Sequence, residues 1–463
     1  MTFKTVKKIK CLIQEFKNIS IISSFTKDQL NAYLAVKEII DLQKEDKPYQ
    51  KIISIEGGAG VGKTWLTSQL IDLFHDDIKI TFTAPTHEAL GVAKTMLKEI
   101  DVDISTKTIH SFLNLKLDYG LDDKDAEITG KAKLVPNKYR QDLEYTNLLI
   151  IDESSMNSAE MYNNIISVLG TRAKIILFIG DPCQLKPVDG GENPIYNNPN
   201  VLHLELNEIV RQKKDNTLIK MATDIRYFIT HKQYPNNILD YLYATEHVGV
   251  CHDDSFLQHY YSNPFNKMVG SYTNRMVEMY NQHIRYQLTG SNEYLIVGDT
   301  IVFQEPYVDS GDNILFQTGE VCTVTKITEE MDYINLIKFY RVNCESLVDD
   351  GEELPTFIVL DPNDTESLKN YNNMLNSALL DAKTSNFKTR KVLWSKYFKL
   401  KNKYAKIRYN YARTLHKLQG STKHTLYLDA RDFSYFYKKD PDMVLRLIYV
   451  ALTRPSDLLI ILK

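Results

Sequence analysis

The sequence predicts an α/β protein with two parallel-sheet units and a small β-rich insertion in the second. The first unit begins where a short apolar strand at 51–56 runs into a glycine-rich loop and then a helix. Apolar and polar residues alternate at 113–119, which indicates a β-hairpin over about 112–135. Three further apolar strands, each followed by polar residues as at the ligand-binding edge of an open sheet, are expected at 79–84, 147–153 and 174–180.

The second unit and the insertion are expected downstream of these strands. An apolar run at 268–274 reads as a strand of another α/β unit, and strands at 425–428 and after Arg454 belong to the same unit. Between them, we expect a small barrel or sheet over about 295–380, without helices of its own. Its β-like runs, broken by glycines, are at 297–306, 316–327 and 336–342.

The glycine-rich loop GGAGVGKT fills the pattern G-x-x-x-x-G-K-[ST] between a strand and a helix. Glycines let the backbone wrap closely around phosphate oxygens, and a helix N-terminus favours anions. Lys63 is expected to reach the β- and γ-phosphates, and the Thr64 hydroxyl to bind Mg²⁺. The loop therefore predicts a nucleoside triphosphate with Mg²⁺ as its ligands. The residues expected to line the phosphates with their backbone are Gly57, Gly58, Ala59, Gly60, Val61 and Gly62.

Two carboxylates end the strand at 147–153, NLLIIDE. Asp152 is placed to hold Mg²⁺, and Glu153 is placed to polarise an attacking water. Paired acids are common in loops, but at this distance after a glycine loop they indicate nucleotide hydrolysis. Gln184 follows the strand at 174–180 and is expected near the γ-phosphate, with an ordinary turn residue as the alternative.

Isolated polar residues carry a weaker signal. Thr26 is expected to cap a helix over 25–42, and Gln29 in its first turn reads most simply as a surface glutamine. Thr86 and His87 follow the strand at 79–84 directly, where open sheets bind ligands. A lone histidine such as His110 is more often structural than functional.

The charge of the chain is unevenly distributed, although its net value is only −3. Residues 382–428 contain 13 Lys and Arg, eight aromatic residues and no Asp or Glu. Cations beside aromatic rings suit phosphate contacts and base stacking, so this basic segment is expected to bind nucleic acid, with a solvated helix surface as the alternative. Trp394 is expected either to stack on a base or to pack between domains.

Composition excludes several other classes of protein. With 43% apolar and 25% charged residues, the 463-residue chain resembles an ordinary globular protein of about three domains. No apolar run reaches the roughly 20 residues that span a bilayer, and the N-terminus is broken by Gln14 and Glu15, so we expect no membrane segment or signal peptide. The five cysteines form no C-x-x-C pair, which favours a reducing cytoplasm and no zinc site.

The motifs, taken in order, resemble those of superfamily 1 helicases. They are GGAGVGKT, TAPTHEAL, TIHSFL, IIDESSM, IGDPCQLKPV, SYTN, TLHKLQGST and YVALTR. Within the superfamily, the chain is most similar to the RecD-like subgroup, and closest to the Dda-type helicases of T-even-like bacteriophages. The resemblance spans residues 25–463. It implies two RecA-like domains, a hairpin insertion in the first that serves as the strand-separating pin, an SH3-like insertion in the second, and an ATP-dependent DNA helicase that moves 5′ to 3′.

The resemblance also implies a role for each matching residue. Gln29 matches the glutamine that reads adenine, Gln184 matches the one that couples γ-phosphate to DNA, and Arg454 matches an arginine finger. The residues that it implies for phosphate binding, magnesium binding, base catalysis and a second cleft arginine are Lys63, Thr64, Asp152, Glu153 and Arg211. Those that it implies for contact with single-stranded DNA, or for its connection to ATP, are Thr86, His87, His110, Thr273, Asn274, His416 and Gln419.

Domain limits and partners follow from the same resemblance. The expected parts are an N-terminal extension at 1–24, a first RecA-like domain at 25–210, a second at 211–295 with 410–463, and an accessory domain at 296–409. We expect a monomer that binds single-stranded and forked DNA, with single-strand-binding, replication or recombination proteins as further partners. We expect it in the cytoplasm, which is the host's if the chain is phage-encoded.

Two other functions share part of the motif set. A kinase or nucleotide transferase would share the glycine loop and Asp152, but would need neither Arg454 nor the basic segment. An ATP-driven clamp, translocase or protein-displacing remodeller that does not unwind DNA would share every motif. Stimulation of ATP hydrolysis by single-stranded DNA separates the first alternative, and a strand-displacement assay separates the second.

Overall fold

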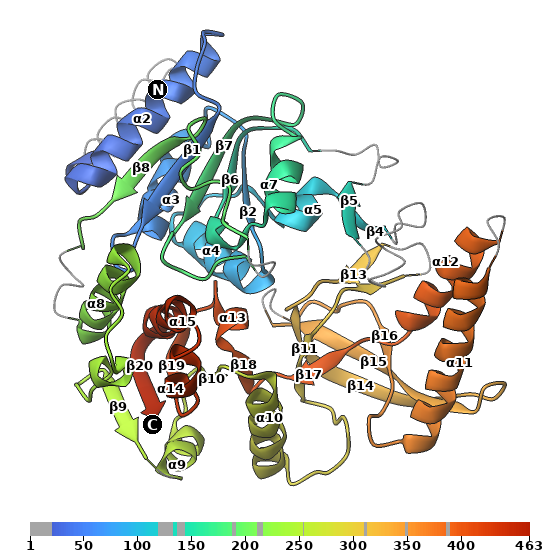
Figure 1. Cartoon of the computed structure of the whole chain (residues 1–463). Helices are drawn as coiled ribbons and strands as arrows, with labels where there is room; N and C mark the ends of the chain where they lie inside the picture. The colour runs from blue at the N-terminus through green and yellow to red at the C-terminus, as the bar shows by residue number, and fades with distance from the viewer. Residues whose placement is uncertain are drawn as a thin grey trace, which may run out of the picture.

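The computed structural model describes residues 21–118, 133–136, 144–187, 191–210, 216–252, 254–309, 313–347, 351–385 and 389–463. Figure 1 shows a first α/β domain, a second α/β domain below it, and a β-rich accessory domain beside the second. The predicted fold class, two RecA-like domains with a hairpin insertion and an SH3-like insertion, is confirmed. Within the described ranges, no helix combines the length and the apolar character needed to cross a bilayer.

The first domain is built on a parallel sheet with strand order β3-β2-β6-β7-β1-β8. Its strands are β1 (Ile52–Gly57), β2 (Ile80–Ala84), β3 (Ser105–Thr108), β6 (Thr146–Ile151), β7 (Ala173–Gly180) and β8 (Leu202–Leu206). Ile and Leu dominate the central strands because both faces are covered, with a separate apolar core on each. The covering elements are α2 (Lys27–Lys44), α3 (Lys63–Phe74), α4 (His87–Glu99), α5 (Ile109–Leu113), η1 (Ser154–Met156) and α7 (Ala159–Ile166).

The predicted hairpin projects from this domain toward the accessory domain (Figure 1). Strand β4 (Leu115–Asp118) pairs antiparallel with β5 (Lys133–Pro136), in a register that places Leu115 opposite Pro136. The residues between the two strands, 119–132, lie outside the described part of the chain. The structure therefore gives the base of the hairpin and its direction.

The second domain contains a smaller parallel sheet with strand order β18-β10-β19-β20-β9. Its strands are β9 (Val248–Cys251), β10 (Lys267–Ser271), β18 (Ala412–Thr414), β19 (Lys423–Asp429) and β20 (Pro455–Leu462). Helix α15 is almost wholly buried because it packs between this sheet and α8. The helical elements are α8 (Thr217–His231), η3 (Ile238–Tyr241), α9 (Ser255–Ser262), α10 (Asn274–Thr289), α13 (Leu415–Leu418), α14 (Phe433–Tyr437) and α15 (Pro441–Thr453).

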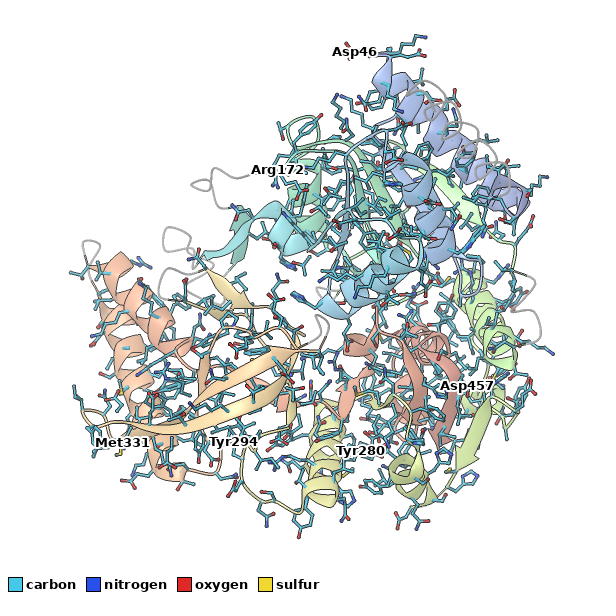
Figure 2. All side chains as sticks on the ribbon, turned by 180° about the vertical axis from the view of Figure 1, so that it is seen from behind. Asp46, Arg172, Tyr280, Tyr294, Met331 and Asp457 are labelled. Atoms are coloured by element: carbon cyan, nitrogen blue, oxygen red, sulfur yellow. The ribbon has the colours of Figure 1, made fainter. Side chains whose placement is uncertain are left out.

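The accessory domain is an antiparallel sheet with strand order β16-β15-β14-β11-β17, and a two-stranded β12-β13 pair packs beside it. Three stacked or edge-on phenylalanines, Phe303, Phe316 and Phe357, fill its core. Figure 2 shows Met331 at the far end of the long β14–β15 hairpin. The strands are β11 (Thr300–Phe303), β12 (Tyr307–Val308), β13 (Ile314–Phe316), β14 (Val321–Asp332), β15 (Ile337–Ser346), β16 (Phe357–Val359) and β17 (Ile407–Tyr409).

The expectation that the insertion over about 295–380 lacks helices was wrong. Helix α11 (Thr365–Thr384) begins directly after the sheet and pairs with α12 (Arg390–Lys401). Asp364 starts α11 locally, because its carboxylate accepts a hydrogen bond from the Ser367 amide at 3.0 Å. Small residues on α11, Ala378 and Ala382, then let the two helices approach closely. The apolar face of α11 is weak in the sequence, and it becomes part of a core only because α12 packs against it.

Trp394 lies in that helix pair and is 4% exposed. Its ring stacks on Phe398 and meets Tyr397 edge-on, each at a centroid distance of 5.7 Å. Neither face of the indole is open to a base in this structure, so the geometry favours the packing interpretation over base stacking. The aromatic residues of the basic segment thus hold α12 against α11.

We predict that Trp394→Ala destabilises the accessory domain by about 3–5 kcal/mol, since it leaves a cavity between two helices. Denaturant unfolding followed by circular dichroism measures this free energy. The matched control is Val392→Ala on the same helix, where the side chain is 70% exposed and the change is expected to stay within about 0.5 kcal/mol. Unchanged stability with weakened binding of single-stranded DNA would instead assign Trp394 to base stacking.

Candidate nucleotide and nucleic-acid site

The glycine loop connects β1 to α3 and has the backbone that its sequence requires. Gly60 and Gly62 have φ values of +77° and +79°, which side chains rarely adopt. A Cβ atom on Gly62 would also lie 2.6 Å from the side-chain Nε2 of Gln29, so any other residue here would displace the Gln29 side chain from the loop. The result is an open backbone cradle at the N-terminus of α3, suited to phosphate oxygens.

Gln29 is fixed against this loop and is 1% exposed, so the simple expectation of a surface glutamine was wrong. Its Nε2 donates to the Val61 carbonyl at 3.0 Å. Its Oε1 accepts from the Thr26 amide at 3.0 Å, and Thr26 Oγ1 accepts from the Gln29 amide at 3.3 Å. This capping box, which confirms Thr26 as the N-cap, sets Gln29 at the entrance of the loop.

Lys63 folds back over the loop and donates to the carbonyls of Gly57 at 2.7 Å and Gly58 at 2.9 Å. Burial lowers the pKa of Lys63, while the nearby carboxylates, Asp181 foremost, oppose that shift. The ammonium is thus held by backbone dipoles and by charges at the ends of neighbouring strands, in a site where an anion stabilises it.

Asp152 and Glu153 follow β6 at the same edge of the sheet. Burial raises the pKa of Asp152 to about 7, and the adjacent Glu153 carboxylate adds to the rise, while the Glu153 amide donates to Asp152 at 2.8 Å. A buried carboxylate beside a second acid is the environment that a divalent cation stabilises. Glu153 has a φ of +48°, a left-handed conformation that is uncommon for a residue with a side chain.

A network across the two domains joins the predicted catalytic residues. Arg454, at the end of α15, lies 3.3 Å from Glu153 Oε1 and is 7% exposed. The Gln184 amide is satisfied with its nitrogen donating to Glu153 Oε2 at 3.0 Å and its oxygen accepting from Arg454 at 3.2 Å. The Gln419 amide nitrogen lies 2.8 Å from Ser155 Oγ and 3.1 Å from the same Gln184 amide. The structure therefore brings together residues from four separate motifs.

The backbone of the motif TLHKLQGST, in the second domain, also lies close to the first domain. Gly420 has a φ of +77°, and a Cβ atom there would lie 3.5 Å from Thr86 Oγ1 and 3.6 Å from Glu153 Cγ. Thr86 caps α4 and accepts from the Ala89 amide at 3.2 Å. The segment that carries His416 and Gln419 is thus in contact with both the acid pair and the start of α4.

The other predicted DNA residues lie along the boundary between the domains, where helices begin or end. Thr273 caps α10, and the next residue, Asn274, accepts from Arg408 of the accessory domain at 3.1 Å. His87 Nε2 lies 3.5 Å from Glu320 Oε2 of that domain. Burial lowers the pKa of His416 on α13 and of His110 on α5, which keeps both imidazoles neutral near pH 7.

Two family models match the chain over its two most distinctive parts. A model described as an AAA domain matches residues 47–233, which contain the glycine loop and the acid pair. A model described as the Dda helicase SH3 domain matches residues 292–409, which contain the accessory sheet and the α11–α12 pair.

Relatives extend these matches over nearly the whole chain. The ATP-dependent DNA helicase dda of Enterobacteria phage T4 is 28% identical over 93% of this chain and 97% of its own length. This chain is similar to the Dda type of ATP-dependent DNA helicase. The helicase also shares 36% identity with the RecBCD subunit RecD of Buchnera aphidicola, over 30% of this chain and 23% of that protein, and it resembles the Dda and RecD types, as its motifs predicted.

Among solved structures, the helicase is similar to a Bacteroides Pif1 bound to single-stranded DNA, with a TM-score of 0.48 and 16% identity over 94% of this chain and 92% of that one. A Pif1 helicase from Candida albicans gives a TM-score of 0.46 and 17% identity, over 95% of this chain and 94% of that one.

Some site residues of the helicase lie outside the predicted set, and one predicted residue lies outside the described structure. Arg211 belongs to the segment 211–215, which is not described. Glu88 of α4 pairs with Arg413 at 3.0 Å and with Lys423 at 3.3 Å, and so ties the first domain to the second. One feature of the sequence could have indicated this ion-pair bridge. Glu88 directly follows His87 in the motif TAPTHEAL, and Arg413 and Lys423 flank the motif TLHKLQGST.

Proposed function

We propose that the protein is an ATP-dependent DNA helicase that translocates 5′ to 3′ on single-stranded DNA and separates the duplex ahead of it. The observation that carries the proposal is the contact between Glu153 of the first domain and Arg454 of the second, with the Gln184 amide bonded to both of them. Because Glu153 belongs to the first domain and Arg454 to the second, we expect the rate of ATP hydrolysis to depend on the relative position of the two domains.

ATP binding is assigned to the glycine loop, with Lys63 as the phosphate ligand and Gln29 beside the loop for the base. Magnesium is assigned to Thr64 and Asp152, since hydroxyl and carboxylate oxygens are the ligands that it prefers. The buried position of Asp152 supports this assignment, because burial and the Glu153 carboxylate raise the pKa of its carboxyl, and a bound cation would stabilise the ionised form. When bound, Mg²⁺ would neutralise charge on the β- and γ-phosphates.

Hydrolysis is assigned to Glu153 as the base that orients water and to Arg454 as the arginine finger. In this structure the two side chains neutralise each other at 3.3 Å. A bound γ-phosphate offers Arg454 a stronger anion, which frees the Glu153 carboxylate to accept a proton. Gln184 donates to Glu153 and accepts from Arg454, so it is placed to respond to the same exchange.

Coupling to DNA is assigned to the segment from Leu415 to Gly420 and to the start of α4. The Gln419 amide lies 3.1 Å from the Gln184 amide, and Gly420 lies close to Thr86. A shift of Arg454 upon hydrolysis therefore changes contacts of the residues proposed to grip DNA, which are Thr86, His87, His110, Thr273, Asn274, His416 and Gln419. The phage T4 relative is an ATP-dependent DNA helicase, which supports DNA as the polymer.

The proposed domain limits are those given by the motifs, 25–210, 211–295 with 410–463, and 296–409, with 1–24 as an extension. The match of the SH3 model to residues 292–409 supports the accessory domain. We further assign the protein to the cytoplasm, which is the host's if the chain is phage-encoded. We assign it as a monomer on single-stranded and forked DNA, with single-strand-binding, replication or recombination proteins as partners.

Strand displacement tests this function against the alternative, a translocase or protein remodeller that does not unwind. Duplexes with a 5′ overhang, a 3′ overhang or blunt ends are mixed with protein, Mg²⁺ and ATP, and release of the labelled strand is followed. Release from the 5′-tailed duplex alone is expected. Release from the 3′-tailed duplex alone would overturn the direction. DNA-stimulated ATP hydrolysis without release from any duplex would favour the alternative.

A matched variant controls this assay. Glu153→Gln is expected to bind ATP and single-stranded DNA but to hydrolyse ATP about 10²–10⁴-fold more slowly, since an amide cannot accept the proton. The measurement is single-turnover hydrolysis beside equilibrium nucleotide binding. Loss of nucleotide affinity in place of a slower reaction would assign Glu153 to metal binding or to the structure of the loop.

A further inference from the structure

A second polar cluster joins the two domains at the glycine loop, apart from the Glu153–Arg454 contact. Asp181, directly after β7, is 1% exposed and accepts a hydrogen bond from the Tyr449 hydroxyl of α15 at 2.5 Å. The same hydroxyl accepts a hydrogen bond from the Ala59 amide of the loop at 3.0 Å. The Arg226 guanidinium of α8 pairs with the other oxygen of Asp181. Two side chains of the second domain therefore meet one carboxylate and one loop amide of the first.

Arg226 lies directly on the glycine loop. A Cβ atom on Gly58 would come within 3.2 Å of Arg226 Cδ and 3.3 Å of its NH1, so glycine at this position leaves room for the guanidinium. Gly58, Ala59, Tyr449 and Arg226 line one cavity of about 140 Å³. The cation thus borders open space beside the part of the loop that Lys63 contacts.

The charges of this cluster are shared with the phosphate ligand. Asp181 is the largest charge acting on Lys63, whose pKa it raises against the effect of burial, and it is also the ion-pair partner of Arg226. One buried carboxylate therefore serves two cations. The Arg226 side chain is 27% exposed whereas that of Asp181 is 1% exposed, so the guanidinium has freedom to turn and the carboxylate does not.

An incoming terminal phosphate would change this balance. It brings negative charge to Lys63 beside the fixed charge of Asp181, and the least confined cation in reach is Arg226. A guanidinium binds phosphate through two parallel N–H donors, which makes it the stronger partner for the new anion. ADP, which lacks that phosphate, leaves the pairing with Asp181 unchanged.

We propose that Arg226 is a phosphate-binding residue that distinguishes ATP from ADP from the side of the second domain, and that Tyr449 is a positioning residue that holds Asp181 and the Ala59 amide for it. This inference rests on the proposed assignment of the glycine loop to ATP. It adds a cation from α8 to the arginines Arg211 and Arg454 implied by the motifs.

The test compares the affinity of each variant for ADP and for a non-hydrolysable ATP analogue, both with Mg²⁺, by displacement of a fluorescent ADP. Arg226→Gln is expected to weaken binding of the ATP analogue roughly 10- to 100-fold, the range for one charge-assisted hydrogen bond, and to change ADP affinity less than about twofold. Arg226→Lys is expected to recover part of the loss. Equal affinity changes for both nucleotides, or none, would overturn the proposal.

A double variant removes the main structural objection, which is that Arg226→Gln leaves a buried carboxylate unpaired. In Asp181→Asn/Arg226→Gln that charge is absent. The selective loss of the ATP analogue is expected to persist if Arg226 reads the phosphate. Recovery of wild-type selectivity in the double variant would show that the unpaired Asp181 had caused the loss, and would overturn the proposal.

Tyrosine variants test the positioning role with a matched control. Tyr449→Phe is expected to lower affinity for the ATP analogue several-fold with ADP unchanged, whereas a merely structural hydroxyl would lower the melting temperature alone. The control is Tyr280→Phe on α10 at the foot of the second domain (Figure 2), where the hydroxyl donates to Asp429 at 2.9 Å and accepts from Arg431 at 3.2 Å. The same chemistry is present there without a glycine loop, so nucleotide selectivity is expected to stay at the wild-type value.

The outcome is independent of the strand-displacement assay. A wild-type protein that unwinds DNA, with an Arg226→Gln variant of unchanged nucleotide selectivity, would overturn this inference alone. A wild-type protein that does not unwind DNA, with a selective loss in Arg226→Gln, would overturn the proposed helicase activity and leave Arg226 as a phosphate-binding residue.

Discussion

Lys63→Ala is expected to abolish measurable ATP hydrolysis, with a rate at least about 10²–10³-fold below that of the wild-type protein. The Lys63 ammonium reaches the carbonyls of Gly57 and Gly58 at the N-terminus of α3, where it would meet the β- and γ-phosphates. Alanine removes this charge from the buried position at the start of α3, which the Arg226 guanidinium on the other side of the loop does not occupy. Release of phosphate in the presence of single-stranded DNA measures the effect.

The control for Lys63→Ala is Lys37→Ala on the outer face of α2. Lys37 makes an exposed ion pair with Asp41 one helical turn away, of a kind that contributes less than about 1 kcal/mol to stability. Its turnover and melting temperature are expected to match those of the wild-type protein. Near-normal turnover in Lys63→Ala, with an unchanged melting temperature, would remove Lys63 from the phosphate site.

Arg454→Ala is expected to lower the DNA-stimulated hydrolysis rate by about 10³–10⁵-fold, the range for arginine fingers in related phosphoryl transfer. The reason is geometric. Arg454 is buried at the domain boundary, and it contacts Glu153 and Gln184 at once. Its loss removes the only cation that the described part of the second domain brings to the acid pair. Single-turnover kinetics with saturating ATP and DNA isolates this effect from binding.

Two further variants define the role of Arg454. Arg454→Lys keeps the charge but loses the planar pair of donors, so the rate is expected to recover only in part. Arg341→Ala, which removes an exposed ion pair with Glu330 in the accessory domain, is expected to leave the rate unchanged. A rate within tenfold of the wild-type value in Arg454→Ala would show that another residue stabilises the transferred phosphate.

The sequence by itself determined the local structures that carry the chemistry. The glycine loop, the Thr26 cap and the acids after the strand at 147–153 depend on contacts between residues close in the chain, so their residue types are sufficient to identify them. Apolar runs located the parallel strands for the same reason, since buried strands covered on both faces require unbroken apolar residues. The hairpin could also be predicted from the sequence, because the alternation of apolar and polar residues indicates which face of a strand is buried.

Only the tertiary structure decided which distant residues meet. The Glu153–Arg454 contact joins residues 301 positions apart, and no local pattern records such a pairing. The basic segment contains no acid, yet its cations find acids elsewhere: Lys406 pairs with Glu305 at 2.7 Å and Arg408 with Glu278 at 3.0 Å. The first pair lies within the accessory domain and the second joins that domain to α10, and composition alone could not distinguish such internal pairing from an anion-binding surface.

The same reason explains Trp394, α11 and Arg226. Periodicity shows which positions are apolar but not what covers them, so a tryptophan between cations read equally well as a base-stacking residue and as a brace until α11 was found against it. No local sequence pattern distinguishes Arg226 on α8. Its proposed role in phosphate binding depends on the tertiary structure, which places α8 beside Gly58 and Asp181. Local residue types fix where phosphate chemistry occurs in this chain, whereas the packing of its domains decides which charges act on it.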